Sequence, residues 1–271
     1  MRVGIKVAMV GVALGLSCTA MAQHSDIDLS LVTEDGVTRI STGISDFENP
    51  GQPVIPNVRV HQAVLNQSGI PGFTNNPGYN AFNGALPPGS LLGFDIVDAL
   101  RVWDPVAQDF ETIPSEQMRV SLFTESRFTP TAPGGFVEGF EFAAVSGNGS
   151  VHQHISYVLG QPLTPGVYLL SLQLRLNVAG IEPSLPFYLV CNHLGDPGEF
   201  AAAVSFMEDS LEPSPSCPAD VTGDGSVNLA DLNLVLANFG QTTADGDANG
   251  DGVVDLADLN AVLASFGITC P

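Results

Sequence analysis

The sequence predicts a mainly β protein, in which a β-sandwich or jelly-roll body with one helix at its C-terminal end precedes a small all-α module. Two observations predict this class. Short apolar runs bounded by Gly, Pro or Asn recur along residues 23–212, as in packed antiparallel sheets. A loop followed by an amphipathic helix then occurs twice, from residue 220 and from residue 247. We expect a cleaved segment at 1–22, the body at 23–212, a linker at 213–216 and the module at 217–271.

The N-terminus has the features of a secretory signal peptide. Arg2 and Lys6 precede an apolar run at 7–16, and Ala20-Met21-Ala22 supplies small residues for cleavage after Ala22. The run is too short for a permanent transmembrane anchor, and no other apolar stretch reaches 18 residues. Leu16-Ser17-Cys18 leaves a lipoprotein site as an alternative. We expect a secreted protein, extracellular or on a bacterial cell surface.

The strands of the body follow in order. DIDLSLVT alternates toward Asp35-Gly36 and continues as VTRIS, which predicts a hairpin. Further runs predict strands: VRVHQAVL, SLLGFDIV, MRVSLFT, HISYVLG, VYLLSLQLRL and LPFYLVC. One helix is predicted from Asp196-Pro197 through FAAAVSFMEDSL, with Glu199 in the capping position. EPSPS then forms a short, stiff linker.

The charge balance excludes one class of partner. Eight Lys and Arg stand against 29 Asp and Glu, for a formal net charge of -21. Phosphate binding requires a basic patch, so we expect no nucleic-acid partner. An acidic surface is typical of secreted proteins that stay soluble, and it does not identify a substrate.

The two repeated loops, DVTGDGSVNLAD and DANGDGVVDLAD, carry the pattern of calcium sites. Oxygen ligands at loop positions 1, 3, 5, 7, 9 and 12 surround a hard cation, and Gly at position 6 (Gly225, Gly252) allows the sharp turn. We therefore expect two Ca²⁺ ions. The predicted ligands are Asp220, Thr222, Asp224, the Ser226 carbonyl, Asn228 and Asp231 in the first loop, and Asp247, Asn249, Asp251, the Val253 carbonyl, Asp255 and Asp258 in the second.

Each loop leads into nearly the same helix, LADLNLVLANFG at 229–240 and LADLNAVLASFG at 256–267. The expected apolar faces, which should bury each other, are Leu229, Leu232, Leu236 and Phe239, and Leu256, Leu259, Leu263 and Phe266. Cys217 and Cys270 bracket the repeat, and a symmetric module brings its ends together. We expect these two cysteines to form a disulfide.

This tandem resembles a type I dockerin, the calcium-dependent docking module of cellulosome enzymes. Asp at position 12 and the lack of a complete entering helix support the resemblance, and similar Cys-bracketed tails occur on secreted proteins of planctomycete-type bacteria. The resemblance implies a docking receptor. Leu229-Ala230 and Leu256-Ala257 replace the Ser-Thr pairs that contact cohesin, so the receptor is cohesin-like or another protein with an apolar, symmetric footprint. The alternative is that calcium only stabilises a small fold.

The histidines of the body are its only indication of chemistry. His152 and His154 are two residues apart on a predicted strand, so both rings face one side, a geometry that suits Zn²⁺ if other ligands complete the shell. His24 and His193 are the candidates for those ligands. The alternative is that these histidines are solvent-facing or satisfied in the core. Cys191 is either a thiolate ligand or, the favoured interpretation, a buried small hydrophobe.

The body resembles a family of secreted bacterial β-proteins under zinc-repressor control, many of which end in a PEP-CTERM sorting tail. HSDIDLSLV, PGFTNNPGYNAF, LLGFDIVDALRVWD and VHQHISYVL carry the resemblance. It implies a metal site that includes His24, His152 and His154. This chain ends in the dockerin-like module instead of a sorting tail.

The resulting functional hypothesis is a secreted, non-catalytic cell-surface or matrix protein. Its calcium-folded tail mediates attachment, and its β-sandwich binds a metal such as zinc. No GxSxG elbow, HExxH helix or phosphate loop occurs in the sequence. The alternative is a secreted polysaccharide-active enzyme or carbohydrate-binding protein displayed through its dockerin, so a glycan or a metal is the expected ligand of the body.

Overall fold

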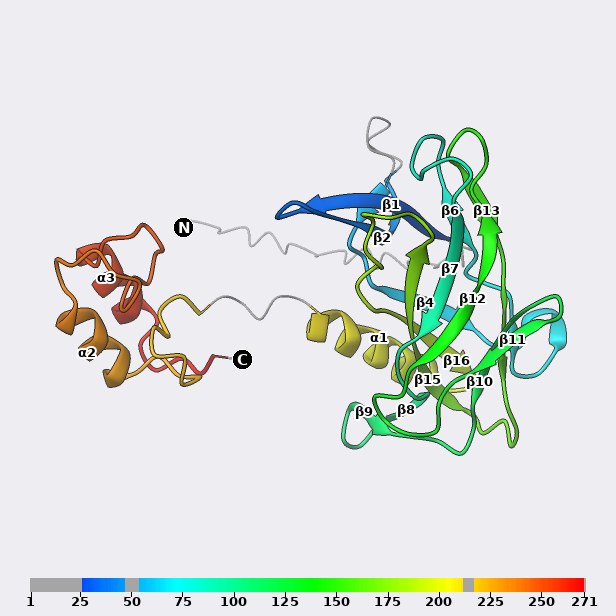
Figure 1. Ribbon diagram of the computed structural model, residues 1–271. Helices are drawn as coiled ribbons and strands as arrows, with labels where there is room; N and C mark the ends of the chain where they lie inside the picture. The colour runs from blue at the N-terminus through cyan, green and yellow to red at the C-terminus, as the bar shows by residue number, and fades with distance from the viewer. Residues whose placement is uncertain (1–25, 47–53, 212–216, 271) are drawn as a thin grey trace, which may run out of the picture.

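The computed structural model describes residues 26–46, 54–211 and 217–270. The predicted signal peptide, its cleavage site, the linker at 213–216 and His24 lie outside these residues. From here the "body" means residues 26–211 and the "tail" means residues 217–270. Figure 1 shows the body as layered β-sheets with one helix and the tail as two helices joined by loops. The prediction of a mainly β protein is confirmed, and the body is β-sandwich-like.

The strands of the body belong to three sheets. The first has the order β13 (Val151–Gln153), β6 (Tyr79–Ala81), β1 (Ile27–Glu34), β2 (Val37–Ser45) and β3 (Val54–Pro56). The second has the order β11 (Glu125–Phe128), β10 (Met118–Leu122), β14 (Ser156–Leu159) and β5 (Phe73–Thr74). The third follows β12 (Val137–Ala144), β7 (Leu91–Ile96), β15 (Gly166–Leu176), β16 (Phe187–His193) and β4 (Val60–Val64), with β8 (Arg101–Asp104) and β9 (Asp109–Thr112) attached through β15. A 3₁₀ turn, Gln67–Gly69, follows β4.

The predicted hairpin is confirmed between β1 and β2. Glu34 pairs with Val37, and the two residues between them have positive φ, 51° at Asp35 and 78° at Gly36. Both values suit the type I′ turn that matches the twist of two antiparallel strands. The hairpin holds β1 in place, and the N-terminal end of β1 carries part of the site described below.

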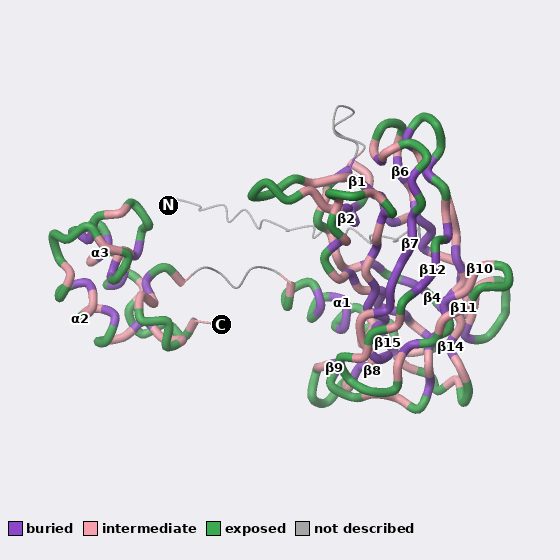
Figure 2. Tube along the Cα trace, viewed as in Figure 1, coloured by how far each residue is buried: buried purple, intermediate pink, exposed green. Residues whose placement is uncertain are grey.

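The long strand β15 separates two apolar layers. Its residues Tyr168, Leu170 and Leu172 belong to the main core between the sheets, whereas Val167 and Leu169 face the other way. There they pack with Trp103, Phe110 and the helix α1 (Pro197–Leu211). Figure 2 shows that the buried positions follow the body strands. The strict alternation along β15 therefore supports a sheet that is covered on both faces.

Helix α1 begins where the sequence predicts it, although a different residue caps it. The Asp196 carboxylate accepts hydrogen bonds from the backbone N–H groups of Gly198 (2.7 Å) and Glu199 (3.2 Å). Asp196 is thus the N-cap, and Glu199 lies in the first turn. The free thiol of Cys191 is fully buried, and this burial raises its pKa to about 12. Cys191 therefore occupies the core as a small apolar residue does.

The tail contains helices α2 (Leu229–Ala237) and α3 (Leu256–Ala264) around a small core of its own. The predicted disulfide is confirmed: Cys217 and Cys270 are bonded, with their Cα atoms 6.0 Å apart. The core contains Ala219, Val227, Val235, Ala248, Val254 and Val262. No helix among the described residues is both long and apolar enough to cross a membrane.

The predicted apolar faces of the two helices are wrong in part. Leu232 and Leu259 do pack against the core, but six members are about half exposed: Leu229, Leu236, Phe239, Leu256, Leu263 and Phe266. The reason lies in the loops. Asp231 and Asp258 are fully buried at the start of the helices and accept hydrogen bonds from loop N–H groups, which turns the faces containing Val235 and Val262 inward. We call the six exposed side chains the twin apolar surface.

Candidate metal centres

Three adjacent strands, β13, β6 and β1, bring the candidate ligands of the body onto one face. His152 pairs with Asn80 of β6, and Asn80 pairs with Asp28 of β1. Because side chains in a strand alternate between faces, positions two residues away lie on this same face. His154, Gly78 and Asp26 occupy those positions, each just outside its strand.

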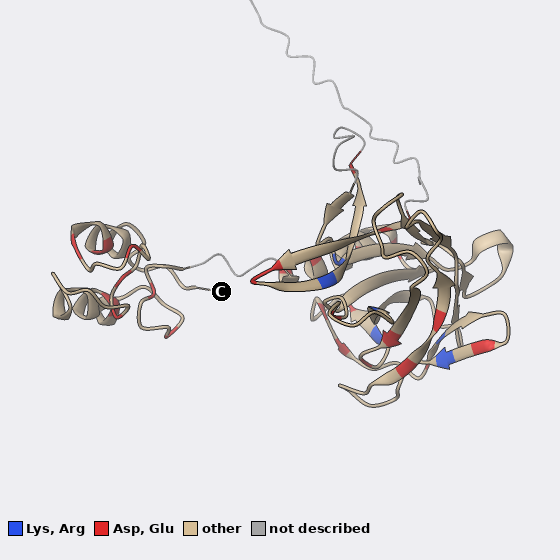
Figure 3. Cartoon of the chain, turned by 45° about the horizontal axis from the view of Figure 1, so that its top comes forward, with Lys and Arg blue, Asp and Glu red and all other residues tan. Residues whose placement is uncertain are grey.

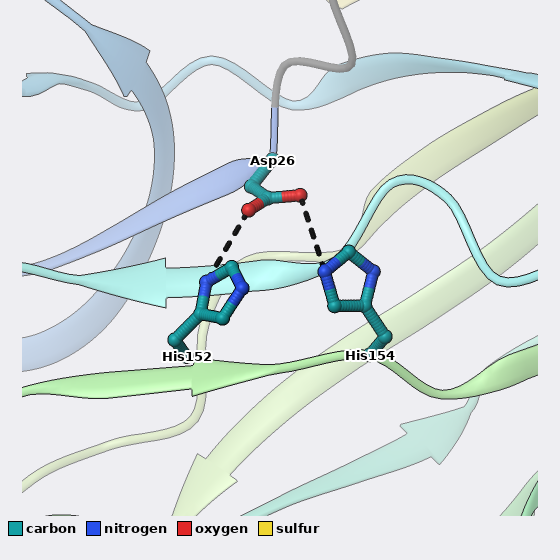
Figure 4. Close-up of side chains that lie close together, drawn as sticks. All are labelled: Asp26, His152 and His154. Atoms are coloured by element: carbon teal, nitrogen blue, oxygen red, sulfur yellow. Dashed lines mark ion pairs between the residues drawn. The ribbon is translucent and has the colours of Figure 1, made fainter.

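Asp26, His152 and His154 converge there (Figure 4). Asp26 Oδ2 lies 3.4 Å from His152 Nδ1, and Asp26 Oδ1 lies 4.0 Å from His154 Nε2. One ligand atom from each residue lies within 4.8 Å of the other two. The two imidazole rings are 5.1 Å apart and nearly perpendicular. The face thus collects two nitrogen donors and one carboxylate at a single point.

Backbone groups orient two of these side chains. His154 Nδ1 lies 2.9 Å from the Asn75 carbonyl oxygen. Since a carbonyl only accepts, Nδ1 is the donor of this bond, and Nε2 is the ring nitrogen that faces Asp26. Asp26 Oδ1 accepts a hydrogen bond of 3.0 Å from the Gly78 N–H. Carbonyl groups that fix the tautomer of a histidine in this way are typical of metal-ligating imidazoles.

Gly78 lies between His154 and Asp26 and makes their approach possible. A Cβ atom at this position would lie 2.6 Å from His154 Cε1, 2.7 Å from His154 Nδ1 and 2.9 Å from Asp26 Oδ1. These separations are too short for any side chain at residue 78. The glycine just before β6 therefore leaves space between His154 and Asp26 at the point where the ligands meet.

The remaining histidines lie elsewhere. His193, a predicted zinc ligand, is buried on β16, where its Nε2 lies 3.2 Å from the Leu163 carbonyl oxygen. It is not part of the Asp26–His152–His154 group. Its Nδ1 has no hydrogen-bond partner among the described residues. His61 is buried beside Phe187, and desolvation lowers its pKa to about 4. His24 lies outside the described residues.

Asp26 was not predicted as a ligand. It stands two residues after His24 in the sequence, but only the parallel pairing of β1 with β6 places it opposite His154. A parallel pair joins segments that are distant in the chain, and no local sequence pattern reveals it. The signal that could have found Asp26 is its position as the first residue of the first predicted strand, two residues after His24.

The carboxylates of the first predicted calcium loop lie close together. Oxygens of Asp220, Asp224 and Asp231 lie within 4.8 Å of one another. Asp220 accepts a hydrogen bond of 2.8 Å from Gly225 N, and Asp231 accepts bonds from Thr222 N (3.0 Å) and Asn228 N (2.8 Å). Gly225 has φ 84°, the left-handed conformation that the predicted turn requires.

The second loop repeats these contacts. Gly252 N donates to Asp247 (2.8 Å), and Asp258 accepts from Asn249 N (3.0 Å) and Asp255 N (2.7 Å). Within the part of the chain that the structure describes, its carboxylates do not form a group of three within 4.8 Å.

Asp231 and Asp258 are the most constrained carboxylates of the two loops. Burial disfavours the charged form of each, but hydrogen bonds from loop N–H groups outweigh it and hold both pKa values below their usual range. Figure 3 shows acidic positions in both body and tail, with basic positions in the body. The loops therefore present ionised carboxylate oxygens, and the tail contains no basic side chain that would pair with them in place of a cation.

Comparison with family models and with curated proteins finds no match. A solved structure of a family 123 glycoside hydrolase from Clostridium perfringens, studied for glycolipid glycan hydrolysis, is similar over 52% of this chain, with 11% identity and a TM-score of 0.25. The match spans 24% of that protein. A similarity this low carries no argument about function.

Proposed function

We propose that this protein is a secreted, non-catalytic component of a bacterial cell surface or matrix. Its dockerin-like tail folds around two Ca²⁺ ions and attaches the chain to a receptor, and its body binds a transition metal such as zinc. The observation that carries the proposal is the convergence of Asp26, His152 and His154, with Gly78 leaving the room between His154 and Asp26. Clustered nitrogen and carboxylate donors of this kind suit Zn²⁺.

The geometry of the three side chains supports a zinc ion. Zinc lies about 2.0–2.1 Å from nitrogen and oxygen ligands, so neighbouring ligand atoms in a tetrahedral shell lie about 3.3 Å apart. The separation of 3.4 Å between His152 Nδ1 and Asp26 Oδ2 agrees with this value. The separation of 4.0 Å between His154 Nε2 and Asp26 involves the other carboxylate oxygen, Oδ1. A shell with one Asp26 oxygen therefore needs a rotation of these side chains, which their partial exposure allows.

The tail supports the attachment role. Its loops hold buried, ionised carboxylates ready for a hard cation. The twin apolar surface leaves Leu236 about as exposed as Leu263, and Phe239 about as exposed as Phe266. Large apolar side chains that stay exposed at matching positions of both helices are suited to burial in a protein–protein contact. A receptor with an apolar footprint fits both halves of the repeat.

The attachment test compares retention of the full chain on cells of the producing bacterium, with calcium and with chelator. We expect retention only with calcium. A variant with Leu236→Ser and Leu263→Ser should lose retention while keeping its helical circular dichroism signal. Val106→Ser is the matched control, because Val106 is an exposed apolar residue of the body. Equal retention in chelator, or equal retention of the double variant, would overturn the attachment role.

A further inference from the structure

An open groove begins at the proposed zinc site. It has a volume of ≈ 590 Å³ and is lined by residues of β6 and β13, by the last residue of β12, and by the segments that follow β6 and precede β13. His152 belongs both to the lining of the groove and to the Asp26–His152–His154 group. Pockets of about 300–1,000 Å³ hold small organic ligands. The groove and the metal centre therefore lie next to each other and share His152.

The lining of the groove combines apolar and polar side chains and is almost uncharged. Its hydrogen-bonding groups are the amides of Asn80 and Asn83 and the hydroxyls of Ser146 and Ser150. His152 is the one titratable residue among the lining residues that the structure describes. Some of these groups are already bonded within the protein: Asn80 Nδ2 donates to Asp28, Asn83 Oδ1 accepts from Asn148, and the two serine hydroxyls bond each other. The Asn80 side-chain oxygen can still accept and the Asn83 NH₂ group can still donate, which suits a ligand that carries hydroxyl groups.

The metal centre adds a position for an anionic donor. Asp26, His152 and His154 supply three ligands, and zinc sites with three protein ligands keep a fourth position for an exogenous group. One carboxylate and two neutral imidazoles leave a divalent ion with a net positive charge. The side chain of His152 is 62% exposed and that of His154 is 32% exposed, so an external ligand can reach the ion.

We propose that this surface binds acidic sugars. The carboxylate of a uronate residue takes the fourth position on the zinc ion, and the sugar hydroxyls form hydrogen bonds with the amides and hydroxyls of the groove. The inference rests on the proposed zinc site and adds its ligand class. Binding is an exchange of a zinc-bound water for the carboxylate, so no covalent bond of the sugar changes.

The test is calorimetry on the full chain in excess calcium, in two stages. Zinc is titrated first, and digalacturonate is then titrated into the zinc-loaded and zinc-free protein, with a neutral galactose disaccharide and acetate as control ligands. We expect digalacturonate to bind at least tenfold more tightly than either control, and only with zinc present.

Groove variants separate the sugar site from the metal site. Ala144→Phe fills the groove at the end of β12, and Asn83→Ala removes one of its amides, without changing a zinc ligand. Each variant should weaken digalacturonate binding at least tenfold with unchanged zinc affinity. Wild-type protein that binds zinc but shows no preference for digalacturonate overturns this inference alone. Protein that binds no zinc overturns the proposed zinc site and the inference together.

Discussion

The disulfide of the tail should set how much calcium the two helices require. Replacement of Cys217 and Cys270 by Ser removes a bond that closes a loop with a sequence separation of 53. In the chain-entropy model, a loop of this length contributes about 4 kcal/mol to stability. The bond also holds the C-terminal residues against the first loop, where Cys270 N donates to the Gly225 carbonyl oxygen (2.9 Å).

Calcium must supply the lost stability. A loss of about 4 kcal/mol is a factor of about 10³ in the folding equilibrium constant, which two cooperatively bound ions offset through an increase of about 30-fold in free calcium. The assay is the circular dichroism of the full chain at 222 nm as calcium is added. Trp103, the single Trp, packs in the body, so its fluorescence serves as the internal control and should not change. Coincident calcium midpoints for wild type and variant would refute the reasoning.

Three further predictions concern single side chains. Asp258→Ala should raise the calcium midpoint of tail helicity more than Thr222→Ala. Asp258 is fully buried and accepts two loop N–H bonds, whereas Thr222 offers only a neutral hydroxyl. Equal midpoints for the two variants would count against the loop assignment. Gly78→Ala should weaken zinc binding by about 10–100-fold, because the new Cβ displaces the ring of His154. Unchanged zinc affinity in calorimetry would refute the geometry of the site. Desolvation lowers the pKa of His61 to about 4 in the folded body, whereas the same side chain takes up its proton near pH 6.5 in the unfolded chain. The contribution of His61 to the stability of the body is therefore fully present above pH 6.5. The free energy of unfolding falls by about 3 kcal/mol as the pH drops from 6.5 to about 4. Urea unfolding followed by Trp103 fluorescence should show this loss in wild type and a smaller one in His61→Gln, and identical pH profiles would show that His61 is not responsible.

Local patterns predicted much of the body. The turn at Asp35-Gly36, the apolar run of β15 and the helix after Asp196 each carry their signal within a few adjacent residues. The pairing of strands is different. The parallel contact of β1 with β6 joins Ile27 to Tyr79, and it decides which side chain joins His152 and His154. The sequence places Asp26 at the start of the first strand, but its role as a ligand depends on that long-range register.

The helices of the tail show a second limit of periodicity. An apolar stripe predicted that Leu236 and Leu263 face the core, but both are about half exposed. The stripe is wide enough to allow two rotations of each helix, and the buried carboxylates select the one that turns Val235 and Val262 inward. The hydrogen bonds of Asp231 and Asp258 at the helix starts therefore determine which face of each helix is buried, and the apolar pattern alone does not.

The most direct test of the account is the metal content of the full chain after equilibration with calcium and zinc and removal of unbound ions. Elemental analysis should find one zinc and two calcium ions per chain. The variant with His152→Ala and His154→Ala should retain two calcium ions and no zinc, with unchanged Trp103 fluorescence as evidence of an intact body. Wild-type protein without stoichiometric zinc, or a double variant that retains zinc, would contradict the assignment of Asp26, His152 and His154 as a metal centre.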